Sequence, residues 1–204
     1  MFKKNKKIFP TDGFTLLEMI IAISIFVTAT IIVSEYILGA YETNRFSIEL
    51  SDAINYAKVG IDSMEKEIRE ASYAENGDYP LVEAQNQSIN FYSDVDSDNA
   101  VEKIKYYLNG TFLIRSVIEP TATQPIQYPS SNEATSTVSQ YIRNGTDPIF
   151  YYYNGDYPQD TTNNPLATPA NVNQVKLVRL LLKINIDPVK TPGDFILEIF
   201  AQLR

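Results

Sequence analysis

The chain of 204 residues contains no cysteine and no histidine. Without these side chains it cannot build a Cys/His zinc site, a thiol nucleophile or a Ser-His-Asp triad. The sequence also lacks a glycine-rich phosphate-binding loop and a pair of acids in a recognisable catalytic pattern. We therefore expect that the protein is not an enzyme and needs no cofactor for catalysis.

Basic charge is scarce outside the first 13 residues. The chain has 17 Lys and Arg against 25 Asp and Glu. The first 13 residues contain one acid, Asp12, and four of the lysines: Lys3, Lys4, Lys6 and Lys7. The remaining residues carry 13 basic and 24 acidic groups, a formal charge of −11. A body this acidic repels a nucleic-acid backbone, so we expect no nucleic-acid partner.

What the sequence does contain is one long apolar run near its start. The 21 residues from Phe14 to Ser34 include a single charge, Glu18. A helix of this length spans roughly 30 Å, which matches the hydrocarbon core of a bilayer. The lysines precede the run and the next basic residue is Arg45. We therefore expect a single-pass helix at 14–35, with the N-terminus in the cytoplasm and the rest of the chain outside.

Glu18 distinguishes this run from an ordinary targeting segment. A cleaved secretory signal has a shorter apolar region that is followed by small residues at the cleavage site. A plain signal anchor has the right length, but an unpaired carboxylate inside hydrocarbon costs at least about 2.5–3.5 kcal/mol. The charge of Glu18 therefore requires a partner.

The lysine-rich segment, Gly13, the stretch FTLLE at 14–18 and the apolar run resemble the class III signal of type IV pilins and pseudopilins. The resemblance implies a leader peptide at 1–13, cleavage between Gly13 and Phe14 by a prepilin peptidase, and methylation of the new terminus to N-methyl-Phe14. It also implies that Glu18 pairs with the N-terminal amine of a neighbouring subunit in a fibre. Two opposite charges in a low dielectric satisfy one another, which is consistent with that role.

A helical pattern continues beyond the apolar run. Apolar residues recur at alternating spacings of three and four, which predicts an amphipathic helix at 36–78. The predicted buried face consists of Ile54, Ala57, Ile61, Met64, Ile68 and Ala71. Asn76-Gly77, followed by Pro80, predicts the end of this helix. A helical repeat or a coiled coil is the alternative for residues 45–75, although the regular pattern lasts under three heptads.

After residue 80 the hydrophobic period changes to two. Segments rich in β-branched and aromatic residues predict strands at 88–93, 103–117, 149–153, 175–186 and 194–204. Asn109-Gly110 predicts a hairpin with a type I′ turn. Two polar stretches, 119–147 and 154–173, are predicted to be loops. The predicted fold class is α+β, a long N-terminal helix packed on an antiparallel β-sheet head at 79–204.

This layout resembles the pilin architecture, and the run at 64–71, the hairpin and the C-terminal strands resemble minor pseudopilins of the J type from type II secretion systems. The chain departs from them in its Thr/Asn/Pro-rich loops and its lack of tryptophan. The resemblance implies an inner-membrane protein with a periplasmic or extracellular head, which helps to initiate or cap a fibre. Its partners would be I- and K-type minor subunits, a major subunit, an inner-membrane assembly platform and, before assembly, membrane lipid.

Two other functions share the same N-terminal signal. A pilus-associated adhesin would present its loops to a ligand, and a major pilin-type subunit would form the fibre itself. The sequence does not separate a secretion pseudopilus from a competence or adhesion pilus.

Alternate acids form a second candidate site, outside the N-terminal signal. Asp94, Asp96 and Asp98, followed by Glu102, resemble the start of a calcium loop. An EF-hand would carry Gly where Asn99 stands and Glu where Lys105 stands. A solvated acidic loop between two strands is therefore the alternative.

Overall fold

The computed structural model describes residues 13–190 and 193–203. Of the leader predicted at 1–13, only Gly13 belongs to this part of the chain, and the four N-terminal lysines lie outside the described residues. The described residues form one long helix, α1 (Leu16–Arg69), a short 3-10 helix and eight strands. The chain divides between Ser47 and Ile48 into two compact units. The α+β fold, one long helix packed on an antiparallel head, is confirmed.

The C-terminal part of α1 supplies one wall of the head's core. Ala57, Ile61, Met64 and Ile68 are at most 3% exposed and belong to one cluster with residues of the strands. Ile54, from the same predicted face, is half-buried. Asp62, Lys66, Arg69 and Glu70 on the other side are exposed, so the predicted amphipathic pattern is confirmed in this region.

The helix ends at Arg69, earlier than the sequence predicts. The backbone N–H of Ser72 donates to the carbonyl of Tyr92 (2.9 Å), so the chain leaves the helix to join the end of a strand. The predicted stop, Asn76-Gly77, lies in a separate turn in which Gly77 has a φ of +88° and donates to the carbonyl of Ala74 (2.8 Å). A tertiary contact therefore ends the helix before the local signal is reached.

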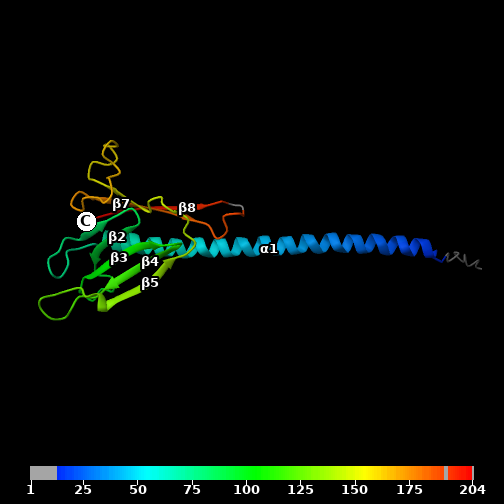
Figure 1. Cartoon of the computed structure of the whole chain (residues 1–204), viewed down its shortest axis with the longest axis horizontal. Coiled ribbons are helices and arrows are strands. Elements are labelled where there is room, and N and C mark those ends of the chain that lie inside the picture. Colours follow the sequence, from blue (N-terminus) through cyan, green and yellow to red (C-terminus); the bar gives the residue numbers. More distant parts are fainter. Residues whose placement is uncertain (1–12, 191–192, 204) are drawn as a thin grey trace, which may run out of the picture. The chain divides into compact units, whose positions relative to one another are not determined.

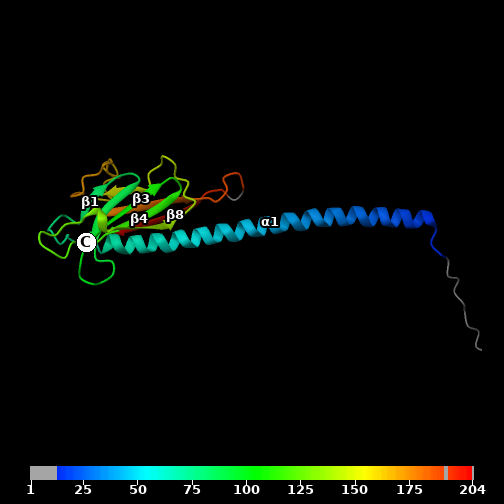
Figure 2. The same ribbon diagram turned by 60° about the horizontal axis from the view of Figure 1, so that its bottom comes forward.

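Five strands form the larger sheet, which is antiparallel throughout. They are β1 (Leu81–Ala84), β2 (Ser88–Ser93), β3 (Glu102–Asn109), β4 (Phe112–Ile118) and β5 (Glu133–Ser139), in that order across the sheet. The strands of this sheet lie alongside the last turns of α1 (Figures 1 and 2). The short 3-10 helix, Ser130–Asn132, leads directly into β5.

A second, three-stranded sheet completes the head, where the sequence predicts one sheet. It contains β6 (Phe150–Tyr153), β7 (Leu177–Ile184) and β8 (Phe195–Gln202), again antiparallel. In β7 the buried residues alternate as predicted: Val178, Leu180, Leu182 and Ile184. These side chains join the same apolar cluster as the face of α1, so the two sheets and the helix share one core.

The β3–β4 hairpin forms with its turn one residue later than predicted. Asn109 pairs with Phe112, so the two-residue loop is Gly110-Thr111 and Asn109 belongs to the strand. Gly110 has a φ of +62°, whereas the described non-glycine residues with positive φ are Ser97, Asn99 and Tyr141. Glycine at the first loop position with positive φ is the pattern of a type II′ turn, and the type I′ prediction is therefore wrong.

The predicted loop at 119–147 contains a strand. β5 pairs with β4 from Glu133 to Ser139, although its sequence, EATSTVS, has no apolar alternation and is mostly exposed. Gly60 of α1 lies against this strand, because a Cβ at Gly60 would come within 3.1 Å of the carbonyl oxygen of Val138. Backbone pairing and this close approach position β5, and neither leaves a hydrophobic period in the sequence.

The second predicted loop, 154–173, forms no strand and is tied to both sheets. The amide of Leu166 donates to the carbonyl of Tyr152 (2.7 Å), and that of Ala170 donates to the carbonyl of Ala84 (2.9 Å). The side chain of Asn164 donates to Asn154 Oδ1 (2.7 Å) and so closes the loop across its base. The prediction of a loop is confirmed here.

Candidate functional site

The predicted processing site lies on an exposed segment that precedes α1. Gly13 and Phe14 stand before the first helical residue, Leu16, and the Phe14 side chain is 83% exposed. A Cβ added at Gly13 would have no atom within 4 Å. Within the described residues, neither Gly13 nor the Phe14 side chain is packed against another part of the chain.

Glu18 closes a capping box at the start of α1. Thr15 is the N-cap residue, and its Oγ1 accepts a hydrogen bond from the Glu18 backbone N–H (3.2 Å). In return, Glu18 Oε2 accepts from the Thr15 backbone N–H (2.8 Å) and from the Thr15 hydroxyl (3.0 Å). The signal for this motif, Thr-x-x-Glu at the start of a helix, is present in the sequence and was not used to predict it.

The capping box occupies half of the Glu18 carboxylate. Within the described part of the chain, Oε2 accepts both hydrogen bonds and Oε1 accepts none. The carboxylate can therefore hold the helix start and still offer one oxygen to a positive group from elsewhere.

The helix that follows is long and apolar enough to cross a membrane, since an 18-residue stretch of α1 has a mean hydropathy of 2.5. All described residues from 13 to 45 are exposed. The hydroxyls of Ser24, Thr28, Thr30 and Ser34 each donate to the carbonyl four residues earlier, at 2.8–2.9 Å. These internal hydrogen bonds satisfy the polar side chains of the run without water, as a lipid environment requires.

The acids between β2 and β3 gather into one cluster. One carboxylate oxygen from each of Asp94, Asp96, Asp98 and Glu102 lies within 4.8 Å of the others. Asp96 and Asp98 are exposed and Asp94 is partly exposed, as expected for a solvated loop, but Glu102 is fully buried. The structure therefore brings the three predicted calcium ligands together and adds Glu102 to them.

Burial of Glu102 follows from the alternation of β3. Glu102 is in phase with Ile104 and Tyr106, which also point into the core, so the period-two pattern contained this signal. The pKa of Glu102 is raised to about 7, chiefly by burial, with smaller contributions from the charges of Glu119 and Asp96, while hydrogen bonds from backbone N–H groups, the strongest from Val95, oppose the rise. The fold thus keeps a carboxylate where its charge is costly.

A second carboxylate, the half-buried Glu67, joins α1 to the larger sheet. Its Oε2 accepts hydrogen bonds from the Tyr106 hydroxyl (2.7 Å) and from Arg115 Nε (3.1 Å), and its Oε1 lies 2.9 Å from Arg115 Nη2. Burial raises the pKa of the Tyr106 hydroxyl, so the hydroxyl stays protonated as a donor. Both oxygens of Glu67 therefore have partners within the cluster, and the cluster links α1 to β3 and β4.

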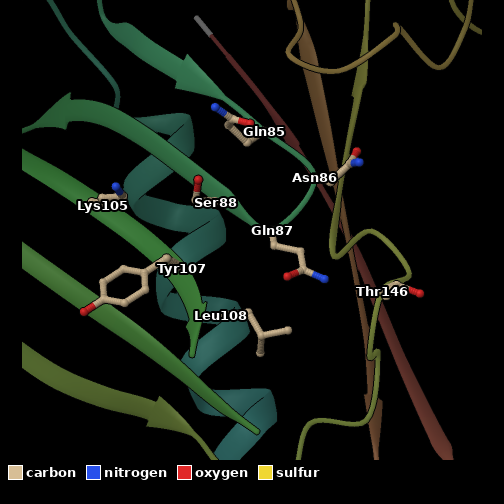
Figure 3. A pocket seen from close by; sticks show the side chains of 8 residues that line it. All are labelled: Gln85, Asn86, Gln87, Ser88, Lys105, Tyr107, Leu108 and Thr146. Atoms are coloured by element: carbon tan, nitrogen blue, oxygen red, sulfur yellow. The ribbon is translucent and has the colours of Figure 1, made fainter. Parts of the chain in front are cut away.

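An open depression lies beside the β1–β2 turn (Figure 3). It is lined by Gln85, Asn86, Gln87, Ser88, Lys105, Tyr107, Leu108 and Thr146. Gln87 Nε2 donates to the carbonyl of Gly145 (2.7 Å), and the carbonyl of Asn86 accepts from the amides of Ile149 and Phe150 (2.8 and 3.0 Å). These contacts hold the β1–β2 turn against the segment that leads into β6. The Gln87 side chain and the Asn86 carbonyl therefore have a structural role in this depression.

No protein-family model matches this chain, and no curated protein matches its sequence. The features that bear on function are therefore those of the chain itself. Gly13 immediately precedes the apolar run, and Phe14 and Glu18 lie within its first five residues. The acidic cluster belongs to the head unit and is separate from them.

Proposed function

We propose that the protein is a type IV pilin-like structural subunit, processed between Gly13 and Phe14 and assembled into a fibre through its N-terminal helix. The observation that carries the proposal is a helix that is exposed from residue 16 to 45, contains a long apolar run and has a carboxylate, Glu18, in its first turn. In water such a surface is unstable, so it needs lipid at one stage and the same helices of other subunits at another. A prepilin peptidase would act on the cytoplasmic side, and the head would lie in the periplasm or outside the cell.

Glu18 supports assembly rather than simple anchoring. An ionised carboxylate with one oxygen left over opposes partitioning into lipid, at a cost that reaches about 2.5–3.5 kcal/mol at the bilayer centre. Pairing with the amine of a processed neighbour removes that cost in the fibre, where both charges leave water together. The capping box fixes the direction of the side chain, which favours one geometry for such a pair.

Within this class we propose a minor, J-type subunit at or near the fibre tip, with I- and K-type minor subunits and the major subunit as partners. A shaft subunit is covered above and below by identical neighbours, so each protrusion must fit at every repeat. The loop at 154–173 is such a protrusion. The stretch at 119–147 gives weaker support, because β5 occupies part of it.

Single cysteines at Ser131 and Thr162 test the tip position, because both residues are exposed and the chain contains no cysteine of its own. We expect disulfide or bifunctional crosslinks mainly to minor subunits, at a yield per fibre that does not change with fibre length. Crosslinks mainly to the major subunit, in proportion to fibre length, would instead show a shaft subunit.

A further inference from the structure

We propose that Asp94, Asp96, Asp98 and Glu102 form a calcium site in the connection between β2 and β3. One oxygen from each carboxylate lies within 4.8 Å of the others. Two ligand oxygens on opposite sides of Ca²⁺, each about 2.4 Å from the ion, are about 4.8 Å apart, so the spread of the four oxygens does not exceed the width of a calcium coordination shell. This site lies in the head and is independent of the proposed role of the N-terminal helix.

The four carboxylates are already aligned by the loop backbone. Each accepts one hydrogen bond from a backbone N–H through one oxygen: Asp94 from Ser97 (2.7 Å), Asp96 from Asp98 (3.2 Å), Asp98 from Ala100 (2.7 Å) and Glu102 from Val95 (2.9 Å). Among the residues that the structure describes, no donor reaches the second oxygen of any of the four. One oxygen of each acid is therefore left for a ligand.

Glu102 provides the independent indication that the cluster binds an ion. Its side chain is 0% exposed, and Oε1 has no hydrogen-bond partner within the described ranges. Buried polar atoms almost always have a partner, and an unpaired buried carboxylate oxygen is expensive. The three aspartates beside it accept hydrogen bonds and cannot donate one when ionised. A cation bound among the four carboxylates supplies the missing partner for Oε1.

Asn99 stands where an EF-hand calcium loop has glycine, and the backbone shows how asparagine can take that place. This residue has a φ of +74°, and asparagine is among the few residues that adopt this conformation readily, so it takes the backbone shape that glycine gives an EF-hand. Glu102, at the first position of β3, supplies the buried carboxylate in place of the missing acid at Lys105.

The number and kind of ligands favour calcium. Ca²⁺ takes six to eight oxygens from carboxylates, carbonyls and water, whereas Mg²⁺ keeps most of its water and uses one or two carboxylates. Glu119, just after β4, also faces the cluster. Burial is the main cause that raises the pKa of Glu119, and the negative charges of Asp96 and Asp98 raise it as well. A bound ion would therefore offset repulsion between this loop and the start of the β4–β5 connection.

Calcium titration of the full chain in detergent micelles tests the proposal. We expect one Ca²⁺ per chain by calorimetry, with a Kd in the range of extracellular modules or tighter (about 10⁻³ M or below). The melting temperature of the head should rise with CaCl₂ over the value in chelator, and an equal concentration of MgCl₂ should leave it almost unchanged. Glu102→Gln and Asp96→Asn should each weaken calcium binding at least tenfold.

The variants separate loss of binding from loss of folding. Glu102→Gln should melt in chelator at or above the temperature of the unsubstituted chain, because the amide carries no charge and can donate to the neighbouring aspartates. If this variant does not fold, the exposed Asp96→Asn decides. Asp156→Asn, in the loop at 154–173, is the matched control and should keep the rise in melting temperature with calcium. An unchanged melting temperature in calcium, an equal shift with Mg²⁺, or an unaltered Kd in the folded cluster variants would overturn the proposal.

Discussion

A fragment that begins at Leu81 is expected to remain unfolded, whereas one that begins at Arg45 folds into a soluble head. The shorter fragment lacks Ala57, Ile61, Met64 and Ile68, which are at most 3% exposed and cover the core side of both sheets. Burying a large apolar side chain contributes about 1.5–3 kcal/mol. Loss of three such side chains, with Ala57, approaches the whole stability of a typical domain, about 5–15 kcal/mol.

Loss of the helix also leaves Arg115 and the Tyr106 hydroxyl without Glu67, their common acceptor. Circular dichroism and thermal melting distinguish the two fragments. The longer fragment should melt cooperatively, and the shorter one should show no transition and should aggregate. Cooperative melting by the fragment that starts at Leu81 would show that the helix face is dispensable to the core.

Replacement of Glu18 by Gln is expected to reduce incorporation into fibres by about 10–100-fold, as much as replacement by Ala, since about 1.4 kcal/mol corresponds to a factor of ten. Gln can still accept the hydrogen bonds of the capping box from Thr15, but it has no charge to pair with an amine. Both substitutions should leave membrane insertion intact or improve it, because they remove a charge from the apolar run.

Thr15→Ala is the matched control for Glu18→Gln. It removes the hydroxyl of the cap, at a cost of about 1 kcal/mol to the helix start, and keeps the charge of Glu18. We expect it to assemble at close to the level of the unsubstituted chain. Quantitative blots of sheared fibres and of membranes measure both quantities. Wild-type assembly of Glu18→Gln, together with failure of Thr15→Ala, would show that Glu18 serves the helix cap alone.

Several parts of the fold could be predicted because a local pattern and a tertiary contact agree. The face of α1 at Ala57, Met64 and Ile68 has the helical period, and the buried residues of β7 alternate as a half-buried strand does. The hairpin was predictable from Asn109-Gly110, but the register was not. Asn109 pairs with Phe112, so the turn lies one residue later than the Asn-Gly signal predicts, and a shift of one residue is not encoded in that local signal.

The rest depended on contacts that leave no period in the sequence. β5 is polar and lies at the edge of the sheet, so its backbone hydrogen bonds to β4 are not reflected in its side chains. The end of α1 is decided by the contact between Ser72 and Tyr92, which are far apart in the chain. Two features of the candidate sites were readable but missed: the Thr15-x-x-Glu18 capping box, and the alternation that buries Glu102.

The mass of the mature N-terminus tests the central proposal most directly. The chain should be expressed in a host with a prepilin peptidase, extracted from membranes and fibres, and digested for mass spectrometry. If the protein is a pilin-like subunit, its N-terminal peptide begins at Phe14 and carries one methyl group on the amine, and a host without the peptidase yields a chain that still contains Gly13. Assembled fibres whose subunits retain Met1, or begin at any residue other than Phe14, would contradict the proposal.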